Sequence, residues 1–179
     1  MKGKVLKIRE IGDPVLNKKS KNIPLDKIKS KEVREVISNL KETFEYNEGL
    51  GIAAPQIGEN VNIILVKVEK EKCTYENAEE VPLTIMINPK IKATTDKTDI
   101  QFEGCLSLPG NVRGKVERFL EVSVSYYTEN GEIVKRKVSG FFARLLQHET
   151  DHLNGEIFIY KLTDPRAIST KENINKFKL

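Results

Sequence analysis

The sequence predicts an α+β fold in which mostly antiparallel β-sheets pack around a buried helix. One observation behind this class is an amphipathic helical pattern near the N-terminus. A second is a series of Ile- and Val-rich segments separated by turn signals, and a third is an apolar helical segment after a hairpin signal. The 179 residues show no repeat and no flexible linker, so we expect a single domain over residues 1–179.

The first predicted elements are a short strand and a long helix. Residues 5–11 form an apolar segment that ends at a Gly-Asp-Pro turn, which predicts a strand. Between residues 29 and 46, apolar side chains recur at three- and four-residue steps: Val33, Val36, Ile37, Leu40 and Phe44. This spacing places them on one face of an amphipathic helix, which we expect to pack on a sheet.

The middle of the chain is predicted to be mostly β-structure. Residues 62–68, 83–88 and 100–108 are rich in apolar or β-branched side chains, which indicates three strands. Residues 67–82 are charged and lack a sustained apolar period, so we expect a loop or hairpin tip there. Cys73 lies in this segment, and its surroundings indicate an exposed free thiol.

A hairpin and a helix are predicted to follow. Residues 121–127 alternate between apolar and polar, and residues 133–138 continue after an Asn-Gly pair that is typical of a tight hairpin turn. The apolar residues that start at Phe141 predict a buried helix that extends to about Leu153. A second Asn-Gly pair then ends the helix.

This last helix carries the clearest chemical signal. The only two histidines of the chain, His148 and His152, form an HExxH motif around Glu149. Positions i and i+4 share one face of a helix, so both imidazoles can bind one metal ion while the glutamate handles a proton of metal-bound water. With no third histidine, a further protein ligand must be Cys73, Cys105 or a carboxylate.

Two other segments have an unusual composition. Residues 49–56, GLGIAAPQ, have little side-chain bulk, which lets another group approach the backbone closely. Residues 103–110, EGCLSLPG, place Cys105 where a predicted strand gives way to a turn. Taken singly, each pattern is common, because glycine-rich turns and buried cysteines occur in many folds.

The three segments GLGIAAPQ, EGCLSLPG and QHETDHLNG together, in this order, resemble the signature segments of the peptide deformylase family. The resemblance extends from the Gly-Asp-Pro-Val-Leu segment through Asn88 and Pro89 to the motif helix. It implies a hydrolase that removes the formyl group from the N-terminal formylmethionine of newly made polypeptides and releases formate.

The resemblance also implies a role for each motif residue. Cys105, His148 and His152 are the implied metal ligands, and water completes a tetrahedral site. The implied native metal is Fe²⁺, with Zn²⁺, Ni²⁺ or Co²⁺ able to occupy the same site. Metal coordination lowers the pKa of bound water, so that hydroxide attacks the formyl carbon while Glu149 acts as base and then as acid.

By the same resemblance, the developing oxyanion is met by the backbone N–H of Leu106 and the side-chain amide of Gln56. The glycine-rich segment pairs with an extended peptide as an added strand. The predicted substrate-binding residues lie close to the motifs: Gly49, Leu50, Gly51, Glu103, Gly104, Phe141 and Leu145. Leu50, Phe141 and Leu145 are candidates for a methionine pocket, although the last two fit plain core packing equally well.

Two other interpretations remain open. HExxH also occurs in zinc peptidases, and Glu172 lies 20 residues beyond His152, where one peptidase clan has its third ligand. The other is a non-catalytic domain in which a metal only stabilises the fold. Structural zinc sites normally use four protein ligands, however, and have no use for a glutamate beside the metal.

The composition restricts the cellular location and the binding partners that we expect for the protein. The net charge of +4 comes from 30 basic and 26 acidic residues, a balance that does not favour DNA binding. No apolar run of membrane-spanning length is present, and two cysteines suit a reducing compartment, so we expect a cytoplasmic protein without membrane association. The basic tail with Lys171, Lys176 and Lys178 predicts either a frayed terminus or a transient ribosome contact.

Overall fold

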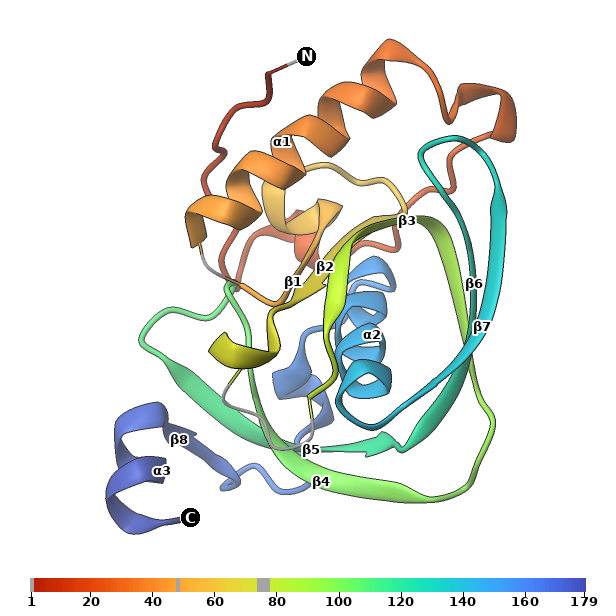
Figure 1. Ribbon diagram of the computed structural model, residues 1–179. Helices are drawn as coiled ribbons and strands as arrows, with labels where there is room; N and C mark the ends of the chain where they lie inside the picture. The colour runs from red at the N-terminus through yellow and green to blue at the C-terminus, as the bar shows by residue number, and fades with distance from the viewer. Residues whose placement is uncertain (1, 48, 74–77) are drawn as a thin grey trace.

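The fold consists of two antiparallel sheets and three α-helices. A computed structural model describes residues 2–47, 49–73 and 78–179. Within these ranges, a five-stranded sheet has the order β1-β2-β3-β6-β7 and a three-stranded sheet the order β4-β5-β8. All strand pairs are antiparallel (Figure 1), so the predicted α+β class with antiparallel sheets is confirmed.

The elements have the following bounds. The larger sheet consists of β1 (Gly51–Ala53), β2 (Ile63–Val68), β3 (Val81–Ala93), β6 (Glu121–Tyr127) and β7 (Ile133–Ser139). The smaller sheet consists of β4 (Thr98–Gly104), β5 (Val112–Phe119) and β8 (Ile168–Thr170). The helices are α1 (Lys31–Asn47), α2 (Gly140–Leu153) and α3 (Lys171–Phe177). The predicted hairpin is confirmed as β6 and β7, which pair along their whole length.

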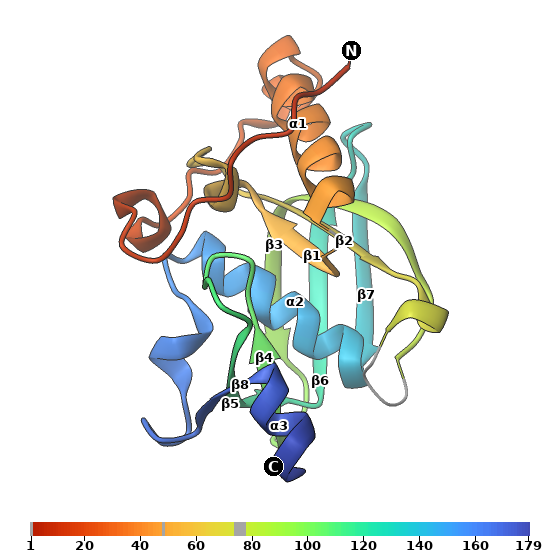
Figure 2. The ribbon, with the colours of Figure 1, turned by 90° about the vertical axis from the view of Figure 1, so that its left-hand side faces the viewer.

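Helix α2 lies at the centre of the molecule, between the two sheets (Figures 1 and 2). Its apolar residues Phe142, Ala143 and Leu146 are buried against the inner face of the larger sheet. Helix α1 packs on the opposite face of the same sheet, over β1 and β2. The larger sheet therefore has α2 on one face and α1 on part of the other. None of the helices in the described ranges is both long and apolar enough to cross a membrane.

Two strands that carry signature glycines lie at sheet edges. Strand β1, which contains Gly51, is an edge strand of the larger sheet, and β4, which contains Gly104, is an edge strand of the smaller one. An edge strand presents backbone N–H and C=O groups that no neighbouring strand uses. Each sheet thus offers a backbone edge next to a signature motif.

The predicted strand at residues 5–11 is wrong. This segment is held by isolated hydrogen bonds, in which the Arg9 N–H donates to the Gln56 carbonyl (2.8 Å) and the Ile11 N–H donates to the Ser107 carbonyl (2.9 Å). The acceptors lie in a 3₁₀ helix and a turn, not in a strand, so no ladder can form.

The prediction of a frayed C-terminus is also wrong. Residues 168–170 form β8, which pairs with β5 from Val112↔Thr170 to Gly114↔Ile168, and α3 follows directly. The side chain of Thr170 caps this helix by accepting a hydrogen bond from the Asn173 N–H. Long-range pairing with β5 orders a polar segment whose own sequence has no apolar period.

We expect Leu146→Ala to lower the free energy of unfolding by about 2–5 kcal/mol, because the truncation leaves a cavity between α2 and the larger sheet. Leu25→Ala is the matched control, because Leu25 is 59% exposed, and its effect should stay within about 0.5 kcal/mol. Urea denaturation measures both. Similar losses in the two variants would contradict the central position of α2.

Candidate active site

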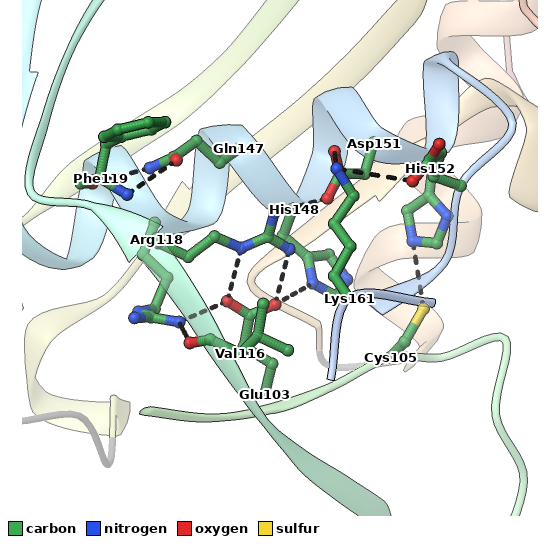
Figure 3. A network of polar contacts seen from close by, with 12 residues as sticks. Glu103, Cys105, Val116, Arg118, Phe119, Gln147, His148, Asp151, His152 and Lys161 are labelled. Atoms are coloured by element: carbon green, nitrogen blue, oxygen red, sulfur yellow. Dashed lines mark hydrogen bonds and ion pairs between the residues drawn. The ribbon is translucent and has the colours of Figure 1, made fainter. Parts of the chain in front are cut away.

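Cys105 and the two motif histidines meet in one place. His148 and His152 project from α2 toward the end of β4 (Figure 3), and the Nε2 atom of His152 lies 3.2 Å from the Cys105 Sγ atom. One potential ligand atom from each of the three side chains lies within 4.8 Å of the others. This is the arrangement that a single metal ion requires.

The three donors suit a divalent transition metal. One thiolate and two imidazoles are accepted by zinc and by several neighbouring transition metals, and three protein ligands leave a position for water or substrate. Burial by itself raises the pKa of the Cys105 thiol, but His152 and His148 lower it well below its ordinary value. The site thus favours the thiolate, which is the form that binds a metal.

The position of Cys105 follows from the end of β4. The strand stops at Gly104, and the Leu108 N–H donates to the Cys105 carbonyl (3.1 Å), which closes a turn. The Ser107 N–H then donates to the Cys105 sulfur (3.4 Å). Two hydrogen bonds of one short turn therefore fix the sulfur next to α2.

The carboxylate of Glu103 lies behind His148 and is 5% exposed. It accepts hydrogen bonds from His148 Nδ1 (2.9 Å) and from Arg118 (2.9 and 3.0 Å), as Figure 3 shows. It also accepts one from Arg144 (2.6 Å). Burial raises the pKa of Glu103, but the hydrogen bonds from His148 and Arg118 hold it well below its usual range. Because Nδ1 of His148 is engaged, its Nε2 is left to face the metal position.

The sequence predicted Glu103 as a substrate-binding residue. Its carboxylate is instead hydrogen-bonded to Arg118, Arg144 and His148 behind the metal position. The residue does line the cavity described below. Any contact of Glu103 with a peptide therefore has to come from its backbone.

Sequence reasoning missed the two arginines of this network. Arg144 also donates to the Asp99 carboxylate (2.6 Å), and both arginine side chains are almost completely buried. The position of each arginine in the sequence periodicity could have indicated that it points inward. Arg144 lies four residues before His148, on the same face of α2, and Arg118 occupies an inward position in the alternation of β5.

Glu149 is buried next to the metal position. It is 3% exposed, and burial raises its pKa to about 7. Its Oε2 atom has no hydrogen-bond partner among the described residues. A Cβ atom at position 51 would lie 2.4 Å from its Oε1 atom, so only glycine leaves room for this carboxylate. A carboxylate with a free oxygen in this place is positioned to accept a proton.

Two N–H donors lie beside the same position. The Ala53 N–H donates to Gln56 Oε1 (2.8 Å), so the Gln56 Nε2 group points the other way, toward Ser107 Oγ (3.2 Å) and Cys105 Sγ (3.5 Å). The Leu106 N–H, directly after Cys105, makes no hydrogen bond with the protein in the described ranges. The Leu106 N–H can therefore donate to a negatively charged oxygen, and the Gln56 Nε2 group could do so by giving up one of its two contacts.

A single cavity of about 500 Å³ joins these groups. Its lining includes every residue predicted for the site except His152. It also includes Cys73, which the sequence left open as a metal ligand, and residues that the sequence did not predict: Leu108, Gly110, Asn111, Arg113, Arg144 and Lys171. Cys73 was expected to be exposed, but it is half-buried against the core cluster that also contains Leu145. The cavity has the size and the mixture of apolar and polar walls typical of small-molecule sites.

Glu172, the third ligand of the peptidase alternative, lies elsewhere. It is exposed in the first turn of α3 and takes no part in the cluster formed by Cys105 and the two histidines. The geometry therefore gives no support to a site that combines His148, His152 and Glu172.

Comparison with known proteins identifies the family of the chain. The family model for polypeptide deformylase matches residues 5–167. The chain belongs to the polypeptide deformylase family. It is 44% identical over 158 residues to a peptide deformylase of Halothermothrix orenii, a match that covers 88% of this chain and 94% of the relative.

Other members of the deformylase family show the same relationship. The chain is 40% identical to peptide deformylase 1A, chloroplastic, of Solanum lycopersicum, and it spans 63% of that relative's length. A crystal structure of class I type b peptide deformylase from Acinetobacter baumannii, described as Met-Ala-Ser bound, matches with a TM-score of 0.83 and 33% identity. That match covers 89% of this chain and 99% of the other.

We expect Glu103→Gln to lower the free energy of unfolding by about 3–5 kcal/mol, because two arginines lose their buried counter-charge. Metal affinity should fall about 10- to 100-fold, because the orientation of His148 depends on this carboxylate. Urea denaturation and metal titration measure the two effects. Glu121→Gln, at an exposed position, should change neither, and an equal effect there would argue against the network.

Proposed function

We propose that this chain is a metal-dependent hydrolase that removes the formyl group from the N-terminal formylmethionine of newly made polypeptides and releases formate. The observation that carries this proposal is the cluster of Cys105, His148 and His152 with the buried carboxylate of Glu149 beside it, inside one cavity. Membership of the deformylase family supports it. So does the relative from Acinetobacter baumannii, whose structure is described as bound to the peptide Met-Ala-Ser.

The proposed cofactor is one divalent ion held by Cys105, His148 and His152, with Fe²⁺ as the native metal and Zn²⁺, Ni²⁺ or Co²⁺ as possible replacements. When bound, such an ion lowers the pKa of a coordinated water and polarises the formyl oxygen. Glu103 fixes the orientation of His148 through its Nδ1 atom. Metal analysis after anaerobic purification identifies the native ion.

Glu149 is the proposed proton carrier. In this role it accepts a proton from the attacking water and passes it to the amine as the bond between the formyl carbon and the nitrogen breaks. Its burial and its unpaired Oε2 atom suit this task, because no protein donor competes for the oxygen among the described residues. The products are formate and a free N-terminal amine.

The Leu106 N–H and the Gln56 side-chain amide are the proposed oxyanion donors. Gln56 cannot turn freely, because the Ala53 N–H holds its oxygen. Leu106 is fixed by the turn that also positions Cys105. Donors that are oriented before the reaction stabilise the transition state without further reorganisation.

The substrate peptide is proposed to lie between the edges of β1 and β4, along Gly49, Leu50 and Gly51 on one side and Gly104 on the other. Pairing with a sheet edge recognises the main chain and tolerates many sequences. Selectivity for methionine then requires an apolar pocket. Leu50, Cys73, Phe141 and Leu145 supply one, because they line the cavity and pack against a common core cluster.

We further propose that residues 1–179 act as one catalytic domain in the cytoplasm. The ribosome contact predicted for the C-terminus would use α3, where Lys171, Lys176 and Phe177 are exposed. A plant relative is named chloroplastic, so the compartment has to be determined by localisation of the natural protein.

We expect Glu149→Ala to remain folded and metal-bound. Formate release from a formyl-Met peptide should fall by about 10²- to 10⁴-fold, because the proton carrier is lost. Circular dichroism, metal analysis and a formate assay test the three parts. Retained activity would exclude the proposed mechanism. It would instead favour a metal that only stabilises the fold.

Replacement of the third metal ligand, Cys105 or Glu172, distinguishes the deformylase interpretation from the peptidase interpretation. We expect Cys105→Ala to lose most bound metal and activity, because two imidazoles alone hold a divalent ion weakly. Glu172→Ala should keep both, since this residue is exposed in α3. Metal content and formate release are measured for each variant. If Glu172→Ala lost metal and activity while Cys105→Ala kept both, a zinc peptidase would be supported.

A further inference from the structure

Four lysines gather on the outer face of the larger sheet. Strands β3 and β7 each contribute two of them, and β6, which lies between these strands, contributes two serines. The strand register aligns them in two rows, each with a serine between two lysines: Lys90, Ser125 and Lys135 in one row, and Lys92, Ser123 and Lys137 in the other. These six residues are named the lysine face below.

The lysine face is directed away from the candidate active site. In β6 and β7 the alternate residues Val122, Val124 and Val138 are buried in the core cluster that contains α2, so the residues between them point outward. Helix α1 packs on the outer face over β1 and β2, and its core cluster also takes in Ile85 and Ile87 of β3, which lie before the lysine positions of that strand. In Figure 1, α2 lies inside β6 and β7, and no helix lies outside them.

The four lysines have no acidic partners. All are exposed, and none forms an ion pair within the part of the chain that the structure describes. Glu121, one row beyond Ser123 on β6, is the next acidic residue on this face. By sheet geometry, the lysines are about 7 Å apart along a strand and about 10 Å apart across β6. Like charges at such distances repel each other, and an anionic partner would remove this repulsion.

We propose that the lysine face binds the phosphate backbone of RNA. Lysine side chains contact phosphates without reading bases, and a shallow hollow of about 560 Å³ lies over these residues. An anionic lipid surface fits less well, because interfacial binding needs apolar side chains to insert, and the two rows contain only lysine and serine. The choice of RNA rests on the proposed function, since newly made polypeptides emerge from ribosomes.

The overall charge gives no sign of this surface. The near balance of 30 basic and 26 acidic residues averages over the whole chain. The two pairs of lysines lie in segments that are far apart in the sequence, and each pair alone is unremarkable. Only the antiparallel pairing of β3 and β7 with β6 brings them together.

The test compares two variants with the same change in net charge. In the first, Lys90, Lys92, Lys135 and Lys137 are all replaced by Gln. In the control, the exposed Lys18, Lys19, Lys29 and Lys31 are replaced by Gln. Binding of a short RNA hairpin is followed by fluorescence anisotropy between about 0.05 and 0.2 M salt. We expect the first variant to bind at least tenfold more weakly at low salt, with a salt slope smaller by about 3 to 4, and the control to retain most of the binding.

Several results would overturn the proposal. One is an equal loss of RNA binding in both variants, and another is the absence of RNA binding by the unmodified protein. A third is a loss of RNA binding when only Lys176 and Lys178 are replaced. So would binding to phosphatidylserine vesicles that depends on the lysine face while RNA binding does not. Formate release from a short formyl peptide should be unchanged in both variants, because no substituted residue lines the cavity. Failure of deformylation in the unmodified protein would count against the proposed function and not against RNA binding.

Discussion

The rest of the structure depends on the hydrogen bonds that the buried carboxylate of Glu103 accepts. It lies on β4 and receives hydrogen bonds from Arg118 on β5 and from Arg144 and His148 on α2. It therefore joins the smaller sheet to the central helix and at the same time orients a proposed metal ligand. A buried ion pair of this kind contributes little net stability compared with apolar packing, but removal of one partner leaves the others uncompensated. These contacts tie β4, β5 and α2 together at one point.

Close approach explains one of the signature glycines. At position 51 a Cβ atom would overlap the buried Glu149 side chain, whereas at position 104 it would displace the flexible end of the Arg113 side chain. Both glycines lie on edge strands, and both line the cavity. The absence of a side chain at position 51 thus makes room for the Glu149 carboxylate, and at both positions it leaves the cavity side of the edge strand open, where the peptide is proposed to lie.

The larger sheet separates two kinds of surface. Its inner face packs on α2, which carries the proposed catalytic groups, and its outer face is divided between α1 and the lysine face. Because alternate residues of a strand point to opposite faces, β3, β6 and β7 supply core residues to the inner face and the lysine face to the outer one. A partner on the lysine face would leave the cavity open to a peptide.

The sequence by itself determined the features that depend on local spacing and residue chemistry. The HExxH spacing predicted two ligands and a proton carrier, the Asn-Gly pair between two strand segments predicted a hairpin, and three signature segments predicted the family. These signals are short-range, so they can be recognised without a structure. The strand predicted at residues 5–11 was wrong, because a strand needs a partner that local sequence does not reveal.

Only the tertiary structure decided which distant residues meet. It places the Glu103 carboxylate behind the metal position and orders residues 168–170 as a strand on β5, whereas the meeting of Cys105 with His152 was already implied by the family resemblance. It also buried Arg118 and Arg144 as partners of one carboxylate and aligned four lysines across three strands. The physical reason is common to all of these. Strand register and helix packing are set by contacts between segments far apart in the chain, and no local pattern encodes those distances.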